Sequence, residues 1–200
     1  MEALIGTDEL KRLMKLPGDV RGVVFKTDFD YVRGLRGEEG VGQLSEAFRA
    51  VGQPLDYDQI VSMDFYPIGL RIISLLLIKK LFTLTDGDIK KIGIAAPKLS
   101  LIIKLFTKYF PSITLTASQA PTMWLKHYRA GNLVVREISE KDKRIVLRLE
   151  NLTLNPIFCK YLEGYFLTVV HMVVGSATTS SEIACPFRGD LAHEYLLTWQ

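Results

Sequence analysis

Hydrophobic residues follow different periods in the two halves of this chain. Up to Thr114 they recur at the three- and four-residue spacing of amphipathic helices, as Val41, Leu44 and Phe48 do. Beyond that point, apolar and polar residues alternate in stretches such as 145–149, which is the period of a half-buried strand. The sequence therefore predicts an α+β fold in which a helical N-terminal half is followed by an antiparallel sheet.

Stop signals near the N-terminus separate a short arm from the rest of the chain. Thr7 precedes a helical pattern that Pro17 and Gly18 bring to an end. We therefore expect residues 1–18 to form an arm helix and residues 19–200 to form a single domain.

Capping residues and prolines divide the remaining N-terminal half into helices. Thr27 and Thr85 are expected to cap two of them, and Pro97 is expected to be the first residue of the last one. The expected helices are 27–35, 41–51, 69–82, 85–96 and 97–110.

Turn signals arrange the C-terminal half around one long helix, 157–174, which Asn155 and Pro156 open. Residues 130–132 are expected to be a hairpin turn between strands, and residues 139–143 a second turn. Two final strands, expected at 183–187 and 191–199, complete a meander that packs on the long helix.

Composition and charge limit the possible partners. The chain of 200 residues is 48% hydrophobic with a net charge of +3, and its basic residues are interleaved with acidic ones, which gives no support to nucleic-acid binding. Its most apolar run, 72–78, is far shorter than the roughly 20 residues that span a bilayer. Two cysteines and the absence of a targeting pattern in residues 1–15 favour a cytoplasmic protein without a membrane span.

The stretch 157–199 carries both cysteines of the chain. If residues 188–190 form a three-residue hairpin loop, Cys185 and His193 oppose each other with β-carbons roughly 4.5 to 5.5 Å apart. A thiolate and an imidazole at that separation can bind one zinc ion. Cys159, in the first turn of the long helix, is expected to join them and to gain thiolate character from the helix N-terminus.

Glu182 is the fourth candidate ligand, although residues 182 and 185 point to opposite faces of a regular strand. A β-bulge, or a place for Glu182 in the preceding loop, is needed for it to join the others. Two buried free cysteines with a hydrogen-bonded histidine, or a disulfide between Cys159 and Cys185, are the alternatives to a metal site.

These residues resemble a known family. The pattern is Cys159-x4-Gly164-Tyr165 followed by Glu182-x2-Cys185-x3-Gly189-Asp190-x2-His193. It is similar to the C-terminal half of the 4-vinyl-reductase domain family, closest to the sensor domains of phenol- and xylene-responsive bacterial activators. In those domains the matching Cys, Glu, Cys and a third Cys hold a structural zinc, so the resemblance implies a zinc site in which His193 replaces one cysteine.

The resemblance extends to a wider fold, shared with haem-NO-binding domains and Golgi-transport tethering subunits, through residues 124–150. The haem-binding branch needs a histidine near Ile102, on the helix before 109–111, and that place is apolar. It also needs a Tyr-x-Ser-x-Arg motif, which 147–151 do not supply. No haem is therefore expected.

The family resemblance implies a hydrophobic or aromatic ligand between the sheet and the helical half. Trp124, His127, Tyr161 and Tyr165 could line such a pocket, or they could be ordinary core and surface aromatics. We therefore expect a sensor or regulatory domain that acts through a partner protein or a homodimer. Its alternatives are a ligand-free scaffold related to the tethering subunits and a vinyl-reductase-like factor of tetrapyrrole metabolism. An enzyme is less favoured, because four protein ligands would leave a zinc ion no open position.

Overall fold

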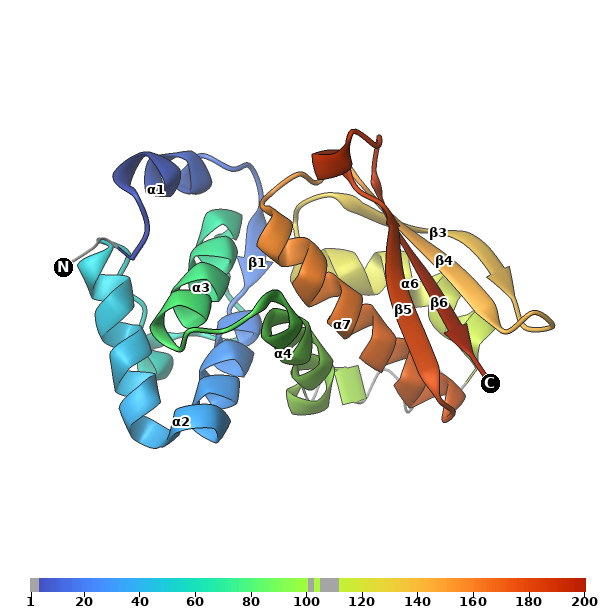
Figure 1. The fold of residues 1–200 in the computed structure, drawn as a ribbon, viewed down its shortest axis with the longest axis horizontal. Helices are drawn as coiled ribbons and strands as arrows, with labels where there is room; N and C mark the ends of the chain where they lie inside the picture. Colours follow the sequence, from blue (N-terminus) through green and yellow to red (C-terminus); the bar gives the residue numbers. More distant parts are fainter. Residues whose placement is uncertain (1–3, 101–102, 105–111) are drawn as a thin grey trace.

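The computed structural model describes residues 4–100, 103–104 and 112–200. Its N-terminal helices lie on one side of the molecule and an antiparallel sheet on the other, with α7 between them (Figure 1). The helices of the first half are α1 (Thr7–Met14), α2 (Val23–Ala50), α3 (Ile68–Leu81) and α4 (Asp86–Leu99). Two short strands, β1 (Asp19–Arg21) and β2 (Phe65–Pro67), pair beside them. This arrangement confirms the predicted α+β class.

The C-terminal sheet has four antiparallel strands in the order β3-β4-β6-β5. The strands are β3 (Asn132–Ser139), β4 (Arg144–Glu150), β5 (Thr178–Ala184) and β6 (His193–Trp199). In a meander, each strand lies beside the next one in the sequence. The expected meander was therefore wrong, because β4 and β5 are not neighbours. The helix α7 follows β4 and returns the chain to the far edge of the sheet, so that β6 fills the place beside β4.

The central helix α7 (Pro156–Val174) begins and ends where the sequence predicts. The side chain of Asn155 accepts a hydrogen bond from the Ile157 amide, and Gly175 closes the helix in the left-handed conformation with φ 68°. It is the one helix among the described residues long and apolar enough to cross a membrane, but 56% of that window is buried within the protein. It contacts α4 on one side and β5 and β6 on the other.

The helices α4 and α7 cross at two glycines. A β-carbon on Gly93 would overlap the main-chain carbonyl of Tyr161, and one on Gly164 would overlap the carbonyl of Lys90. Only glycine permits this approach, and Thr168 adds a 3.0 Å hydrogen bond from its hydroxyl to the carbonyl of Ile94.

A buried ion pair joins α2 to α3 inside the helical half. The guanidinium of Arg71, which is 0% exposed, donates to the carboxylate of Asp28, and the hydroxyl of Ser74 donates to the same carboxylate at 2.6 Å. The guanidinium also lies 4.2 Å from the ring centre of Tyr161 on α7. Burial raises the pKa of Asp28, and the charge of Arg71 opposes that shift.

Two predicted helix starts in the first half were wrong. Thr27 lies inside α2 and its hydroxyl donates to the carbonyl of Val23 at 2.7 Å, so it caps no helix. Pro97 lies in the last turn of α4 rather than at the start of another helix. Thr85 caps α4 as predicted, with a reciprocal bond to Asp88. Most of the expected helix 97–110 falls outside the described residues.

A non-helical glycine separates the two helices that were expected within α2. Gly37 has φ 67° and ψ −162°, so the regular helical conformation is interrupted between the expected segments 27–35 and 41–51. The α1 arm packs on α3, where the absence of a side chain on Gly69 lets the main chain of Leu13 approach. The boundary at residue 18 remains a prediction.

The hairpin expected around residues 130–132 was also wrong. Helix α6 (Ile113–His127), which Ser112 caps through a 3.1 Å bond from the Leu115 amide, ends directly before Tyr128. Tyr128 then forms a bridge with Val20 rather than a strand pair with β3. The first long hairpin is β3 with β4, joined at the predicted turn 139–143.

The last two strands start at different residues from those predicted. Strand β5 begins at Thr178 rather than at residue 183, and β6 begins at His193 rather than at residue 191. Leu191, expected to open the last strand, lies outside it and is 94% exposed.

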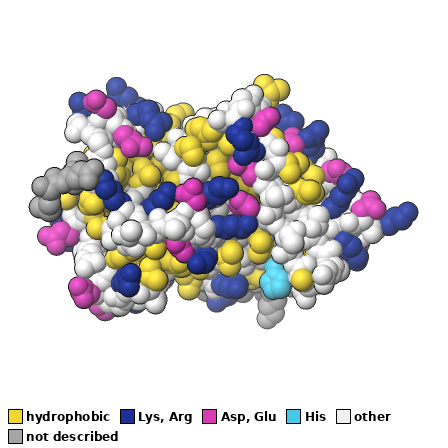
Figure 2. Space-filling view, viewed as in Figure 1, with side chains coloured by type: hydrophobic (Ala, Val, Ile, Leu, Met, Phe, Trp, Pro, Cys, Tyr) yellow, Lys and Arg dark blue, Asp and Glu magenta, His cyan; other side chains and the backbone are white. Residues whose placement is uncertain are grey.

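Charged side chains of both signs are mixed over the face shown in Figure 2, with hydrophobic side chains between them. This distribution follows the interleaved charges of the sequence. No extended patch of one sign is visible on that face.

Candidate metal centre and ligand cavity

Four side chains from three parts of the chain meet at one end of α7. Cys159 comes from the first turns of α7, Glu182 from β5, Cys185 from the residue after β5, and His193 from the first residue of β6. Their candidate ligand atoms all lie within 4.8 Å of one another. The group is largely buried and could hold a metal ion.

The separations within this group match a tetrahedral site. The Cys159 sulfur lies 3.9 Å from the Cys185 sulfur and 3.7 Å from Nδ1 of His193. Nδ1 of His193 lies 3.1 Å from Oε1 of Glu182. Tetrahedral bonds of zinc to sulfur, nitrogen and oxygen place the ligand atoms roughly 3.3 to 3.8 Å apart. Little movement is therefore needed to bind an ion.

The orientation of His193 suits a metal ligand. Its Nε2 atom lies 3.0 Å from the carbonyl oxygen of Leu152, which fixes the proton on that nitrogen. Nδ1 then faces Glu182 and the sulfurs, either with a lone pair or as part of an imidazolium. A lone pair on Nδ1 would repel the carboxylate of Glu182 unless a cation lay between them. Histidines that bind metals usually donate their other ring N–H to a backbone carbonyl or a similar acceptor, as Nε2 of His193 does here.

Electrostatics favours a cation at the same place. Burial, followed by the negative charges of Glu182 and Cys185, raises the pKa of the Cys159 thiol. This is opposite to the thiolate expected from the helix N-terminus. Burial alone would raise the pKa of Glu182, but the hydrogen bond and charge of His193 hold it below its ordinary value, with help from Arg188. A divalent ion would replace the thiol protons and relieve this crowding.

The hairpin geometry expected for Cys185 and His193 was wrong. The strand partner of His193 is Leu149 on β4, and β5 ends at Ala184. The chain then turns through a short 3-10 helix, Pro186–Arg188, because proline cannot continue a ladder of hydrogen bonds. The side chains of Cys185 and His193 nevertheless reach the same group.

The bulge that Glu182 requires is present. The register of β5 against β6 shifts between Glu182 and Ala184. Glu182 is also held by Arg188, whose Nη1 lies 3.2 Å from Oε2. The turn after β5 is closed by Asp190, whose carboxylate accepts a 2.7 Å hydrogen bond from the amide of Cys185.

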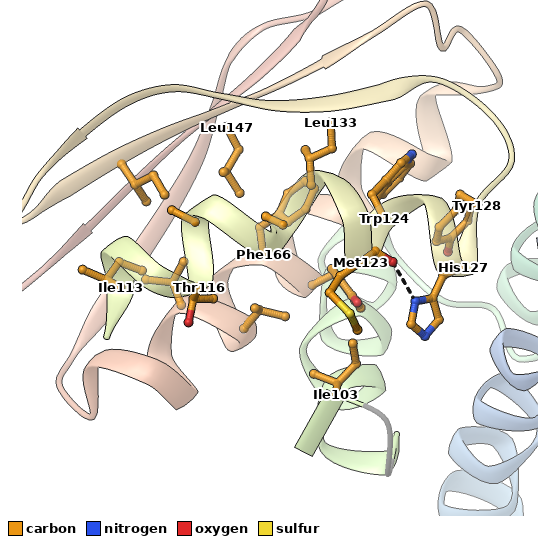
Figure 3. A pocket seen from close by; sticks show the side chains of 16 residues that line it. Ile103, Ile113, Thr116, Met123, Trp124, His127, Tyr128, Leu133, Leu147 and Phe166 are labelled. Atoms are coloured by element: carbon orange, nitrogen blue, oxygen red, sulfur yellow. Dashed lines mark hydrogen bonds between the residues drawn. The ribbon is translucent and has the colours of Figure 1, made fainter. Parts of the chain in front are cut away.

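An apolar cavity of about 60 Å³ lies between α6, α7 and the sheet. Figure 3 shows the side chains that surround it, with α6 along one wall and the strands β3 and β4 above. Trp124, His127 and Tyr165 line this cavity, and Tyr161 lines an adjoining one of about 20 Å³. The remaining walls of the first cavity are mostly aliphatic, and they include Ile113, Ala117, Leu133, Leu147 and Val170.

His127 is one of the few polar side chains that line this cavity. Its side chain is 7% exposed, and Nδ1 lies 3.0 Å from the carbonyl oxygen of Met123 (Figure 3). Its Nε2 atom is buried and has no hydrogen-bond partner among the described residues. Burial lowers the pKa of His127. The neutral ring therefore donates from Nδ1 and offers Nε2 as an unfilled acceptor.

The other predicted pocket aromatics are more fully engaged. The indole of Trp124 stacks on Tyr128 with ring centres 4.4 Å apart, and its N–H donates to the carbonyl of Ala130 at 2.9 Å. Tyr161 lies beneath the guanidinium of Arg71. These residues shape the cavity walls, and Trp124 has no free donor for a ligand.

Sequence reasoning missed two parts of this region. The small residues Ala117 and Ala120 on α6 form one wall, but the helix itself was not predicted, although Ser112 supplied its capping signal. The pair of Asp28 and Arg71 was not singled out either, and no local pattern joins residues 43 positions apart.

Comparison with solved structures identifies the class of fold. An H-NOX protein from S. oneidensis in an Fe(II)NO state matches with a TM-score of 0.69 and 15% identity, covering 90% of this chain and 99% of that one. An H-NOX domain from Shewanella oneidensis in an Fe(II)CO state gives 0.66 and 13%, covering 90% and 98%. A Tt H-NOX variant gives 0.64 and 13%, covering 90% and 95%.

This likeness shows an H-NOX-like fold over most of the chain. No family model matches the sequence, and no curated protein matches it. At these low identities, the similarity establishes the fold of the chain without a family assignment.

The cavity does not fit a haem, although another similar solved structure is described by its protein-induced porphyrin distortion. Its volume of about 60 Å³ is well below the roughly 300 to 1,000 Å³ of pockets that enclose even drug-sized ligands. Ile102, the place where the haem branch would need a histidine, lies outside the described residues. We therefore derive no chemistry through a haem.

Proposed function

We propose that this chain is a small-molecule-binding sensor or regulatory domain whose ligand lies directly against protein side chains. The observation that carries this proposal is the unpartnered Nε2 of His127 beside an otherwise apolar cavity. Ligand pockets typically combine an apolar wall with a few polar groups that orient the ligand. A buried acceptor without a partner is costly unless something bonds to it.

The size of the cavity limits the first ligands to test. An apolar cavity of roughly 150 Å³ is large enough for benzene, whereas this one measures about 60 Å³. A hydrophobic molecule of a few heavy atoms fits best, and an aromatic one requires side chains to move. Met123, a flexible lining residue, is well suited to such adjustment.

The proposal includes a structural zinc ion held by Cys159, Glu182, Cys185 and His193. Two sulfurs, one nitrogen and one oxygen at near-tetrahedral separations suit zinc better than magnesium or calcium. Four protein ligands would close the site, so its role would be to clasp α7 to β5 and β6. This is consistent with a relationship to the 4-vinyl-reductase type of sensor domain, and thiolate ligands fit a cytoplasmic location.

A scaffold that binds no small molecule is the second candidate. The small cavity volume favours it, because side chains already fill most of the space between α6 and the sheet. A tetrapyrrole-metabolism factor is less well supported for the same reason, since a porphyrin is far larger. In either role, we expect signalling or assembly to involve a partner protein or a second copy of the chain.

Binding of small apolar molecules tests the proposal. Titration of the full chain with 1-chlorobutane and toluene should shift the fluorescence of Trp124 and the methyl resonances of Ile113 and Met123. The cavity-filling change Ala117→Leu should abolish those shifts, whereas Ser118→Leu, at an exposed position on the same helix, should leave them unchanged. If neither molecule binds the folded wild type, and native mass spectrometry finds no copurified ligand, the sensor proposal is wrong and the scaffold is favoured.

A further inference from the structure

The apolar cavity adjoins a second, smaller chamber on the side of the helical half. The second cavity has a volume of about 20 Å³ and shares Ile103, His127, Tyr128 and Tyr165 with the first. Its other walls come from α2, α4 and α7. The shared residues therefore form the wall between the two cavities.

The second chamber is richer in hydroxyl groups than the first. Thr27, Ser100 and Tyr161 line it and are absent from the lining of the apolar cavity. The hydroxyl of Thr27 uses its proton on the carbonyl of Val23 and keeps lone pairs to accept. In Figure 3, the imidazole of His127 points away from the strands, so that the ring lies at the end of the apolar cavity.

The groups around this chamber are uncharged at neutral pH. Burial raises the pKa of Tyr161 and of Tyr165, and it lowers the pKa of His127. The buried guanidinium of Arg71 lies over the ring of Tyr161 and is already paired with Asp28, while its Nε and Nη2 atoms have no hydrogen-bond partner among the described residues. A charged group entering here would lose its hydration without gaining a free counter-charge, which is strongly unfavourable.

We propose that the two cavities form one bipartite site for a small amphiphile, with its apolar body beside α6 and its compact, uncharged polar head at His127 and the hydroxyl-lined chamber. This inference rests on the proposed function and specifies its ligand class. A chamber of about 20 Å³ exceeds the roughly 10 to 15 Å³ needed for one water-sized group. The head is therefore a hydroxyl or a group of similar size, and it donates a hydrogen bond to Nε2 of His127.

A series of four-carbon molecules with different heads tests this inference. The probes are 1-butanol, 1-chlorobutane, butyrate and butylammonium, titrated into the full chain at neutral pH and followed by methyl resonances of Ile103 and Met123. One added neutral hydrogen bond should make 1-butanol bind about 3- to 10-fold more tightly than 1-chlorobutane. Butyrate and butylammonium should bind at least about 10-fold more weakly than 1-butanol.

Two variants locate the head. His127→Phe removes the acceptor and keeps a ring, and Tyr161→Phe removes only a hydroxyl from the second chamber. Each should reduce the preference for 1-butanol over 1-chlorobutane without weakening 1-chlorobutane. Tyr31 lies in a separate groove between α2 and α4, so Tyr31→Phe is the matched control and should change neither affinity.

The outcomes separate this inference from the proposed function. If 1-chlorobutane binds as tightly as 1-butanol, the polar-head inference is overturned while the sensor proposal stands. The same holds if the preference for 1-butanol survives in both variants. If none of the four probes binds the folded wild type, the inference is overturned, and the sensor proposal falls with it only if toluene also fails to bind and no ligand copurifies. If His127→Phe does not fold, the preference of Tyr161→Phe for 1-butanol over 1-chlorobutane decides whether the inference stands.

Discussion

The Nε2 atom of His193 lies 3.0 Å from the main-chain carbonyl oxygen of Leu152. Leu152 belongs to the connection between β4 and α7, so this contact orients the imidazole from outside the group of candidate ligands. It leaves Nδ1 directed at the sulfur of Cys159, 3.7 Å away. A metal ion between them would join the start of α7 to the sheet through side chains that are already in position.

We expect the purified protein to contain about one zinc ion per chain and Cys185→Ser to lose it. Removing a sulfur ligand should weaken binding by more than the roughly 10- to 100-fold that changes to supporting groups cause. Elemental analysis of protein prepared under reducing conditions measures this. Ser181→Ala, an exposed position on the preceding strand β5, is the control and should retain the metal. Wild-type protein without zinc would refute the assignment.

Removal of zinc by a chelator should lower the melting temperature by about 5 to 10 °C. An ion that binds only the folded state adds about 2.7 kcal/mol of stability at 100 times its dissociation constant. For a chain of this size, 1 kcal/mol corresponds to about 2 to 4 °C. Differential scanning calorimetry with and without chelator checks the shift, and added zinc should reverse it. An unchanged melting temperature would contradict a clasp between helix and sheet.

Gly164→Ala should destabilise the protein by about 1 to 3 kcal/mol, because the new methyl group overlaps the carbonyl of Lys90 and forces α4 away from α7. Gly42→Ala is the matched control. Gly42 lies in α2 with open space around it, so alanine there should be neutral or stabilising by up to about 1 kcal/mol. Urea unfolding measures both free energies. Equal effects of the two substitutions would show that the crossing is not tight.

Arg71→Met should destabilise the fold by about 3 to 5 kcal/mol, since it leaves the carboxylate of Asp28 buried without a counter-charge. The double change Asp28→Asn with Arg71→Met should recover much of this loss, because both charges are then absent. Urea unfolding of the two single variants and the double variant gives the coupling energy. Strict additivity would mean that the pair does not interact.

His127 should make the fold less stable on mild acidification. Burial lowers its pKa in the folded state below the ordinary value of 6.5, and the carbonyl of Met123 only partly opposes this. The unfolded chain then binds more protons between these two pKa values, so the contribution of neutral His127 is present above about pH 6.5 and is lost as the pH falls through the folded pKa.

The comparison of wild type with His127→Phe measures this contribution. Between pH 7 and pH 5, the free energy of unfolding should fall further for the wild type than for the variant, with both proteins metal-free in the same buffers. A parallel decrease in the two proteins would show that His127 does not titrate differently on folding.

Local signals predicted the elements whose ends depend on neighbouring residues. Asn155 and Gly175 mark the two ends of α7 because capping bonds form within a few residues of the cap. Thr85 marked α4 for the same reason. Helix α6 escaped prediction because its buried face uses small and polar residues, including Ala117 and Thr116, which give a weak hydrophobic period.

The sequence by itself determined the α+β class, the span of α7 and the four side chains that meet beside it. The tertiary structure alone decided that β6 lies beside β4, that Cys185 approaches His193 from a 3-10 turn, and that Asp28 meets Arg71 in the core. The difference has a physical cause. Periodicity and capping are set by interactions within a few residues, whereas strand order, buried ion pairs and cavities depend on packing between distant segments.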